Sequence, residues 1–217
     1  MIAYRLIGLD VDKVLVKPGN FWMELHRVFG TLEQAKPLNE KFLIPGDPQA
    51  YNKLIEAVVV ELWKGKDAEP YFDLVASLPY NNGIGRVFEY VRDQGLKVAL
   101  VSASSYDLGV RIHRDFKVDH IFANKLIIED GKIAGRFDPI VGEGTKEKAR
   151  IMANLCEVYG INRRQAMFVG DGNVDVEAAS SVGFSVAFNS TSEKLRKVAT
   201  RIVDGDNLEN LVEVLPR

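Results

Sequence analysis

The sequence predicts an α/β protein with a doubly wound parallel sheet and a helical cap inserted after the first strand. Three observations lead to this fold class. Short apolar runs alternate with amphipathic stretches beyond Asn81. A mostly helical stretch, residues 17–80, separates the first apolar run from that alternation. The 217 residues exceed a typical single domain, and 47% of them are hydrophobic, which suits a sizeable core.

The first part of the chain predicts one strand followed by helices. Tyr4–Leu9 is an apolar run that ends in acid, which is typical of a buried parallel strand. The "TLEQ" of Thr31–Gln34 has the pattern of a capping box, and Asp47-Pro48 has the form of an N-cap followed by a first-turn proline. Helices are expected at 21–29, from 31, at 47–63 and at 67–77.

After Pro79 and the "NNG" of Asn81–Gly83, helices and strands alternate. Further helices are expected at 83–94, 106–115, 145–159, 174–182 and 207–215. Strands are expected at 96–104, near 120–123, through 167–169, at 183–188 and at 200–204. Asp130-Gly131 lies between two apolar runs within Lys125–Gly135, which is a strong hairpin signal.

The residues that could carry chemistry follow the ends of apolar strands. Asp10 and Asp12 follow the first strand, Ser102 ends "VALVS", and Asp171 and Asp175 lie in the loop "GDGNVD". In an open parallel sheet, ligands bind beyond the carboxyl ends of the strands. Four carboxylates at one edge would repel each other strongly, so a bound Mg²⁺ is expected to compensate them.

A lysine is expected to add positive charge to the same edge. Lys148 opens a helix, and helix starts in this fold face the carboxyl ends of the strands. Lys146 precedes the same helix and is the alternative. The spacing from Gly160, where the helix ends, favours Lys148.

In this order, the residues resemble the motifs of the haloacid dehalogenase-like (HAD) phosphatase superfamily. "DVDKV" at Asp10–Val14 matches its first motif, Ser102 the second, Lys148 the third and "GDGNVD" at Gly170–Asp175 the fourth. The resemblance is closest to the phosphoserine-phosphatase-like branch, through "FANKLIIEDGKIAG" and "KARIM". It implies a Rossmann-like core formed by 1–16 and 81–217, with a helical cap at 17–80.

The resemblance also implies a role for each motif. Asp10 would be the nucleophile that forms an aspartyl-phosphate, and Asp12 the general acid and base. Ser102 and Lys148 would bind the substrate phosphate. Gly172 is expected to allow a tight turn beside the metal. The Mg²⁺ ligands would be the Asp10 side chain, the Asp12 backbone carbonyl, Asp171 and Asp175.

The sequence departs from phosphoserine phosphatases at three places. Lys13 stands where a small residue is usual, Ala103-Ser104 replaces two glycines, and Gly19-Asn20 occupies the neighbourhood of the glutamate that holds the serine amine. These differences leave the phosphatase chemistry intact and argue against phosphoserine itself as the substrate. Candidates to line the pocket from the cap are Phe21, Trp22, Arg27 and Trp63.

Composition argues against nucleic acid or an anionic membrane as a partner. The chain has 28 basic and 30 acidic residues and a net charge of −2, with no basic block for nucleic acid or an anionic membrane. The apolar runs are too short to cross a bilayer, and no secretory leader is recognisable, so a soluble, cytoplasmic protein is expected. Cys156, the single cysteine, is expected to be a buried thiol. The oligomeric state is not indicated.

The expected activity is therefore hydrolysis of a small phosphorylated metabolite. A phosphotransferase or phosphomutase would use the same aspartate pair, so the motifs do not separate it from a hydrolase. A signalling receiver domain also combines acids, a hydroxyl and a lysine. Receivers, however, place the phosphorylated aspartate on a later strand and have no large helical insertion.

Overall fold

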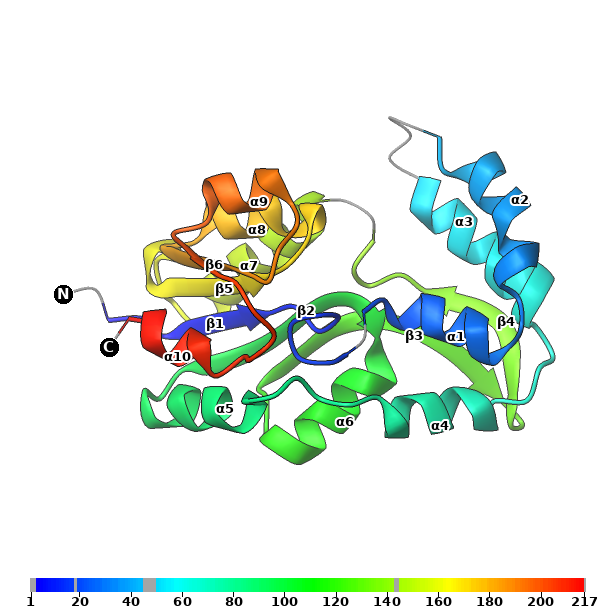
Figure 1. The fold of residues 1–217 in the computed structure, drawn as a ribbon, viewed down its shortest axis with the longest axis horizontal. Coiled ribbons are helices and arrows are strands. Elements are labelled where there is room, and N and C mark those ends of the chain that lie inside the picture. The colour runs from blue at the N-terminus through cyan, green and yellow to red at the C-terminus, as the bar shows by residue number, and fades with distance from the viewer. Residues whose placement is uncertain (1–2, 18, 45–49, 143–144, 217) are drawn as a thin grey trace.

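The computed structural model describes residues 3–17, 19–44, 50–142 and 145–216, and within them it has the predicted α/β architecture (Figure 1). The strands form one sheet in the order β4-β3-β2-β1-β5-β6-β7. All neighbouring pairs are parallel except β3 with β4. The strands are β1 (Leu6–Leu9), β2 (Lys97–Ser105), β3 (His120–Glu129), β4 (Lys132–Asp138), β5 (Ala166–Gly170), β6 (Phe184–Phe188) and β7 (Arg201–Val203).

Strand β1 is central, because β2 pairs with one side of it and β5 with the other. The chain order therefore reverses beside β1, and in such sheets the ligand site lies at this switch point. Successive residues of β1 bury their side chains on opposite faces. Leu6 packs in the cluster that contains Met152 and Ala178, and Ile7 in the larger cluster that contains Val87 and Ile112.

Helices cover both faces of the sheet, as a doubly wound fold requires (Figure 1). One face carries α5 (Ile84–Asp93), α6 (Tyr106–Phe116) and α10 (Asn210–Val214). The other face carries α7 (Thr145–Val158), α8 (Val176–Ser181) and α9 (Glu193–Val198). Short 3-10 helices at Arg163–Gln165 and Asn173–Asp175 flank β5.

The remaining helices form a block, which we call the helical block, between β1 and α5. It consists of α1 (Phe21–Val28), α2 (Leu32–Phe42), α3 (Ala50–Val58), the π-helical turn Val59–Trp63 and α4 (Glu69–Ser77). Backbone hydrogen bonds join the block to the β3–β4 hairpin, from Gly65 N to Ile133 O at 2.8 Å and from Ala68 N to Gly131 O at 2.8 Å. Figure 1 shows α2 and α3 beyond the hairpin, at the end of the molecule opposite both termini.

The sequence predicts two N-terminal helix caps in the helical block. The capping box at Thr31–Gln34 is wrong, because the Thr31 side chain does not cap α2, although α2 begins at Leu32. Its hydroxyl lies 2.8 Å from His26 Nδ1 and accepts from Trp63 Nε1 at 3.2 Å, so the tertiary contacts take the oxygen that a cap would use. The N-cap expected at Asp47-Pro48 lies outside the described residues.

The second half of the chain follows the predicted order with two differences. The short strand near His120 and the first arm of the hairpin form one continuous strand, β3, which pairs with β2 and then with β4. The hairpin turns at Asp130-Gly131, where φ is 49° and 73°, as the sequence predicts. Helix α9 was not expected; it begins where the Ser192 side chain accepts from Leu195 N.

Two expectations from the composition, a buried thiol and no membrane-spanning segment, can be compared with the structure. Cys156 is buried on α7, which confirms the buried thiol, and burial raises its pKa above the ordinary range. No helix among the described residues has the length and apolar character that a membrane span requires.

Candidate active site

The two aspartates that follow β1 have separate environments. Asp10 is buried, and its Oδ2 lies 2.8 Å from Lys148 Nζ while its Oδ1 accepts from the Val11 N–H at 2.8 Å. Asp12 turns to other partners. Its Oδ2 accepts from the Phe21 N–H at 2.9 Å, and its Oδ1 accepts from the Ser104 hydroxyl at 2.8 Å. One carboxylate thus pairs with a cation, whereas the other accepts from two neutral donors.

Lys148 lies at the centre of the acidic cluster. It is 2% exposed, and its Nζ lies 2.8 Å from Asp10 Oδ2 and 2.7 Å from Asp175 Oδ1. Burial by itself would lower the pKa of this ammonium, but the two carboxylates outweigh burial and raise its pKa. Lys146, the alternative, is exposed on the same helix. The structure therefore brings Lys148, and not Lys146, to the edge of the sheet.

Three carboxylates form a group that suits a metal ion. One oxygen each of Asp10, Asp171 and Asp175 lie within 4.8 Å of one another. Burial, and then Asp10 and Asp175, raise the pKa of Asp171 to about 6, and burial raises the pKa of Asp175 as well. Such mutual destabilisation is relieved by a cation, and a few carboxylates with room for waters is the ligand set that Mg²⁺ prefers.

The Asp12 carboxyl lies outside this group and has the properties of a proton donor and acceptor. Burial is the main reason why its pKa is raised from 3.8 to about 7. The hydrogen bonds from Phe21 N and Ser104 oppose this rise, whereas the nearby Asp10 and Asp171 add to it. A pKa close to neutral pH lets one group both give and take a proton during a reaction.

The serines at the end of β2 complete the polar wall of the site. Ser102 is buried, and its Oγ accepts from the Ser104 N–H at 3.2 Å, which leaves a hydroxyl hydrogen to donate. The contact of Ser104 with Asp12 was missed in the sequence. Its signal is the strand period, since Ser102 and Ser104 are two positions apart in β2 and share a face.

The glycine expectation for the acidic loop needs correction. Gly172 has φ −117°, which any residue adopts, and a Cβ there would lie 3.8 Å from Asp175 Oδ2, an ordinary contact. The glycine that the site requires is Gly170, where a Cβ would lie 2.4 Å from Asp175 Cγ. The Asp175 side chain packs directly against β5, and its Oδ2 accepts from the N–H groups of Asp171 and Gly172.

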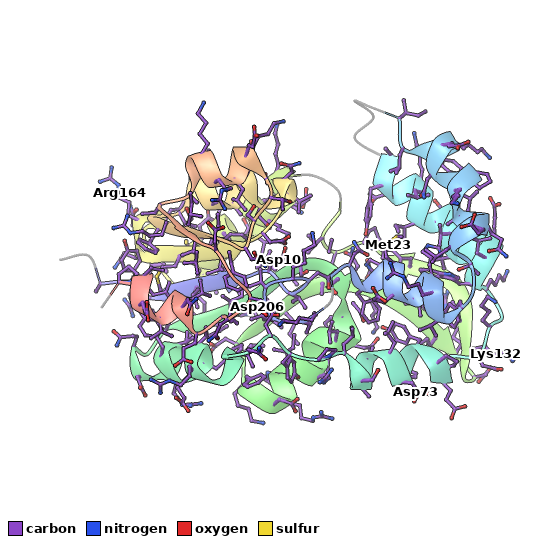
Figure 2. The ribbon with its side chains drawn as sticks, viewed as in Figure 1. Asp10, Met23, Asp73, Lys132, Arg164 and Asp206 are labelled. Atoms are coloured by element: carbon purple, nitrogen blue, oxygen red, sulfur yellow. The ribbon has the colours of Figure 1, made fainter. Side chains whose placement is uncertain are left out.

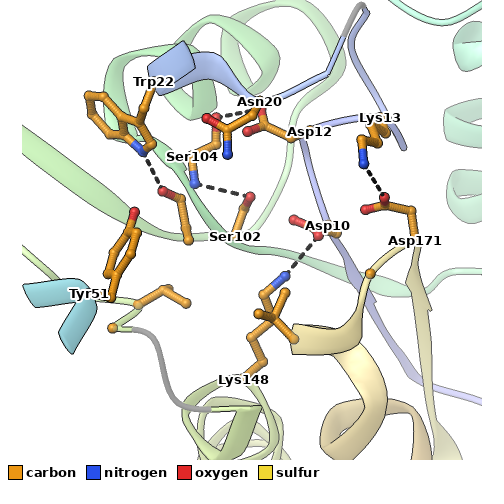
Figure 3. A pocket seen from close by; sticks show the side chains of 15 residues that line it. Asp10, Asp12, Lys13, Asn20, Trp22, Tyr51, Ser102, Ser104, Lys148 and Asp171 are labelled. Carbon is orange, nitrogen blue, oxygen red and sulfur yellow. Dashed lines mark hydrogen bonds and ion pairs between the residues drawn. The ribbon is translucent and has the colours of Figure 1, made fainter. Parts of the chain in front are cut away.

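Lys13, the unusual residue of the first motif, reaches toward the acidic loop. Its φ is 60°, and its Nζ lies 3.3 Å from Asp171 Oδ2 (Figure 3). The side chain is 57% exposed, so solvent screens this pair and its contribution to stability is small. Lys13 therefore acts on the charge of Asp171 at the rim of the site.

Among the candidates from the helical block, Trp22 alone lines the pocket. Its Nε1 donates to Ala103 O at 2.7 Å, which ties α1 to the end of β2. Phe21 and Trp63 are buried in the core, and Arg27 pairs with Glu24 on the surface. Hydrophobic spacing alone does not distinguish a ring that packs in a core from one that faces a pocket.

The site opens into a cavity of about 310 Å³ (Figure 3). Asp10, which follows β1, lies near the centre of the molecule in Figure 2. Asp175 is not one of the residues that line this cavity; its Oδ1 lies 2.7 Å from the Nζ of Lys148, which does line it. Predicted site residues that line the cavity are Asp10, Asp12, Ser102, Lys148 and Asp171.

The fold and this site agree with a known family of hydrolases. The family model of haloacid dehalogenase-like hydrolases matches residues 4–183, and the chain belongs to that family. Within the family it lies in the phosphoserine-phosphatase-like branch, whose members are phosphoric monoester hydrolases. This assignment confirms the resemblance of the four motifs and favours an enzyme over a receiver domain.

Curated relatives support the branch, and a solved structure shows the same fold. A phosphoserine phosphatase of Polaromonas sp. is 31% identical over 216 residues, which cover 98% of this chain and 90% of the relative. One of Archaeoglobus fulgidus is 29% identical over 211 residues, 97% of this chain and 60% of that longer relative. A substrate-bound phosphoserine phosphatase structure has the same fold, with a TM-score of 0.82 and 24% identity over 98% of this chain and 99% of its own.

Proposed function

We propose that this protein is a Mg²⁺-dependent phosphatase that hydrolyses a small phosphomonoester through an aspartyl-phosphate on Asp10. The observation that carries the proposal is the division of labour between two neighbouring acids. Asp10 is paired with the Lys148 ammonium, while Asp12, with a pKa of about 7, is free of any cation contact among the described residues. One acid is thus paired with a cation, and the other has a pKa that suits proton exchange near neutral pH.

In the first step, an Asp10 carboxylate oxygen attacks phosphorus and the bond from phosphorus to the alcohol oxygen breaks. The Asp12 carboxyl gives its proton to the departing alkoxide, so a neutral alcohol leaves. In the second step, Asp12 takes a proton from water as the water oxygen attacks the phosphorus of the aspartyl-phosphate. The bond from phosphorus to Asp10 breaks, which releases phosphate and restores both acids.

The remaining residues bind charge. The Ser102 hydroxyl and the Lys148 ammonium, which both line the cavity, would hold the phosphoryl oxygens. A bound Mg²⁺ would supply positive charge that stabilises the transferring phosphoryl group. Both Asp175 oxygens already have hydrogen-bond partners, which favours binding through water for that residue. The proposed ligands are the Asp10 side chain, the Asp12 backbone carbonyl, Asp171 and Asp175.

We assign the role of a cap to the segment 17–80, with the core formed by 1–16 and 81–217. Trp22 and Tyr51, from α1 and α3, line the catalytic cavity and would exclude water from it. The hydrophobic core runs from the sheet into this segment without a break, since Ile7 and Trp63 belong to the same cluster. The proposed substrate partner is a small phosphorylated metabolite, with neither nucleic acid nor membrane involved. A cytoplasmic location stays a prediction.

The decisive experiment is hydrolysis of p-nitrophenyl phosphate by the wild type and by Asp10→Asn and Asp12→Asn, with Mg²⁺ and with EDTA. Asp10→Asn is expected to abolish turnover, and loss of the general acid in Asp12→Asn costs about 10²–10⁴-fold. Asp73→Asn, a change on the exposed face of α4, is the matched control and should keep wild-type turnover (Figure 2). Near-normal turnover of either active-site variant, or of the EDTA-treated wild type, would overturn the proposal.

A second arm separates a hydrolase from a phosphotransferase. The same assay is run with an added acceptor alcohol, and inorganic phosphate and p-nitrophenol are both counted. Equal amounts indicate transfer to water. A deficit of phosphate that grows with the alcohol concentration would indicate a phosphotransferase, which uses the same aspartyl-phosphate.

A further inference from the structure

A second cavity of about 630 Å³ adjoins the catalytic one, within the helical block. The two cavities share Asn20, Trp22 and Tyr51 in their walls, so the second lies directly beside the first. We call it the helical-block cavity. Part of its wall is apolar and comes from α2, from the residue after α2 and from α3. The apolar wall residues are Leu32, Ala35, Leu43, Leu54, Ile55 and Val58.

The charged groups near this cavity are already paired. Glu33 and Lys36 form an ion pair at 2.5 Å on the exposed side of α2. His26 lies against the Thr31 hydroxyl, and burial lowers the pKa of its imidazole, so the ring stays neutral at physiological pH. No wall residue of this cavity offers an unpaired charge to a substrate within the described chain.

The catalytic cavity is also asymmetric in charge. Its charged residues are Asp10, Asp12, Lys13, Lys148 and Asp171. All of them come from the sheet edge, and each has a partner there. In Figure 3, Trp22 and Tyr51 lie on the side away from Lys13 and Asp171. A substrate ammonium or carboxylate on the side of Trp22 would therefore meet no unpaired charge among the described wall residues, and burial of an unpaired charge is unfavourable.

We propose that the substrate is the phosphate monoester of an apolar alcohol, whose hydrocarbon part runs past Trp22 and Tyr51 into the helical-block cavity. This inference rests on the proposed function, because the phosphate must lie at Ser102 and Lys148 for the chain to point that way. The shared wall residues give the direction, and walls whose charged groups are already paired give the chemistry.

A homologous series of n-alkyl phosphates tests the proposal. From ethyl to octyl phosphate the leaving alcohols have nearly the same acidity, so differences in kcat/KM report binding of the chain. Each methylene buried in the cavity is expected to raise kcat/KM by about two- to fourfold until the cavity is filled. Propyl phosphate should exceed O-phosphoserine, which has a chain of the same length and two charges.

A matched pair of variants locates the binding site of the chain. Leu43 lies in the wall of the helical-block cavity and is 44% exposed, and Ile202, on β7 and outside both cavities, is 43% exposed. Leu43→Asp is expected to lower the octyl-to-ethyl ratio of kcat/KM by about tenfold, and Ile202→Asp to leave it unchanged. Both positions are on the surface, so neither variant is expected to lose its fold.

Binding of n-alkylphosphonates, measured by calorimetry, provides a readout that does not depend on turnover. Octylphosphonate should bind more tightly than ethylphosphonate to the wild type and to Ile202→Asp, with a smaller difference in Leu43→Asp. If p-nitrophenyl phosphate is hydrolysed but the alkyl series is flat, or O-phosphoserine is preferred to propyl phosphate, the substrate assignment is wrong and the phosphatase stands. If no phosphate ester is hydrolysed, the proposed function itself fails.

Discussion

Replacing Lys148 with methionine tests whether one buried ammonium holds the acidic cluster together. The Nζ lies 2.8 Å from Asp10 Oδ2 and 2.7 Å from Asp175 Oδ1, and the residue is 2% exposed. Methionine has a similar length and no charge, so the variant leaves two buried carboxylates facing each other. Removing one partner of a buried ion pair costs about 3–5 kcal/mol in the free energy of unfolding, and the loss of two contacts puts the expectation at the upper end.

The size of this loss depends on pH with a definite sign. Without the ammonium, which lowers the pKa of Asp175 against the effect of burial, the Asp175 carboxylate holds its proton more tightly in the folded variant than in the unfolded chain. A carboxyl whose pKa is raised by folding contributes stability below its unfolded pKa, and that stability is lost as pH rises through the folded pKa. The variant should therefore lag furthest behind the wild type at about pH 8 and recover part of the difference at about pH 5.

The assay is urea unfolding followed by circular dichroism at both pH values, in EDTA so that no metal compensates the cluster. Lys146→Met is the control, because Lys146 is exposed two residues earlier on α7. Surface changes of this kind are expected within about 0.5 kcal/mol of the wild type. Equal losses for the two variants, or a Lys148→Met deficit that does not shrink at low pH, would refute the reasoning.

Two further changes test the proton donor and the packing of the acidic loop. Ser104→Ala removes a hydrogen bond that lowers the pKa of Asp12, so this pKa should rise above about 7 and the alkaline limb of the kcat/KM profile should move to higher pH. Gly170→Ala places a Cβ 2.4 Å from Asp175 Cγ, which should destabilise the protein by about 1–3 kcal/mol and reduce turnover.

Each of these changes has an outcome that contradicts it. An alkaline limb that stays in place or moves to lower pH in Ser104→Ala would show that the hydroxyl does not stabilise the Asp12 carboxylate. For the loop, Gly172→Ala is the matched control, since its Cβ would lie 3.8 Å from the nearest atom of Asp175. If both glycine variants unfold at the same urea concentration, close packing at Gly170 is not what fixes the loop.

Local signals in the sequence determined the elements and the order in which they alternate. Tyr4–Leu9 predicted a buried parallel strand because its apolar run ends abruptly in acid, and the strand forms at Leu6–Leu9. Asp130-Gly131 predicted the hairpin because both residues tolerate the positive φ that its turn requires. The acids and the serine could be assigned to one edge because parallel strands of a doubly wound sheet all end there.

The tertiary structure decided which partners the polar side chains contact. Spacing in the sequence favoured Lys148 over Lys146, and the packing of α7 against the sheet turns Lys148 toward Asp10 while Lys146 stays exposed. Thr31 does not form the expected cap, because its hydroxyl oxygen contacts His26 and Trp63 instead.

The division of work between Asp10 and Asp12 has the same origin. The Ser104 hydroxyl that binds Asp12 lies 92 positions further along the chain, and burial, the main cause of the raised pKa of Asp12, exists only once the helical block and the strand ends are assembled. Sequence periodicity describes neighbours a few residues apart. Hydrogen bonds and desolvation between distant segments depend on distances of a few tenths of an ångström, which only the folded chain sets.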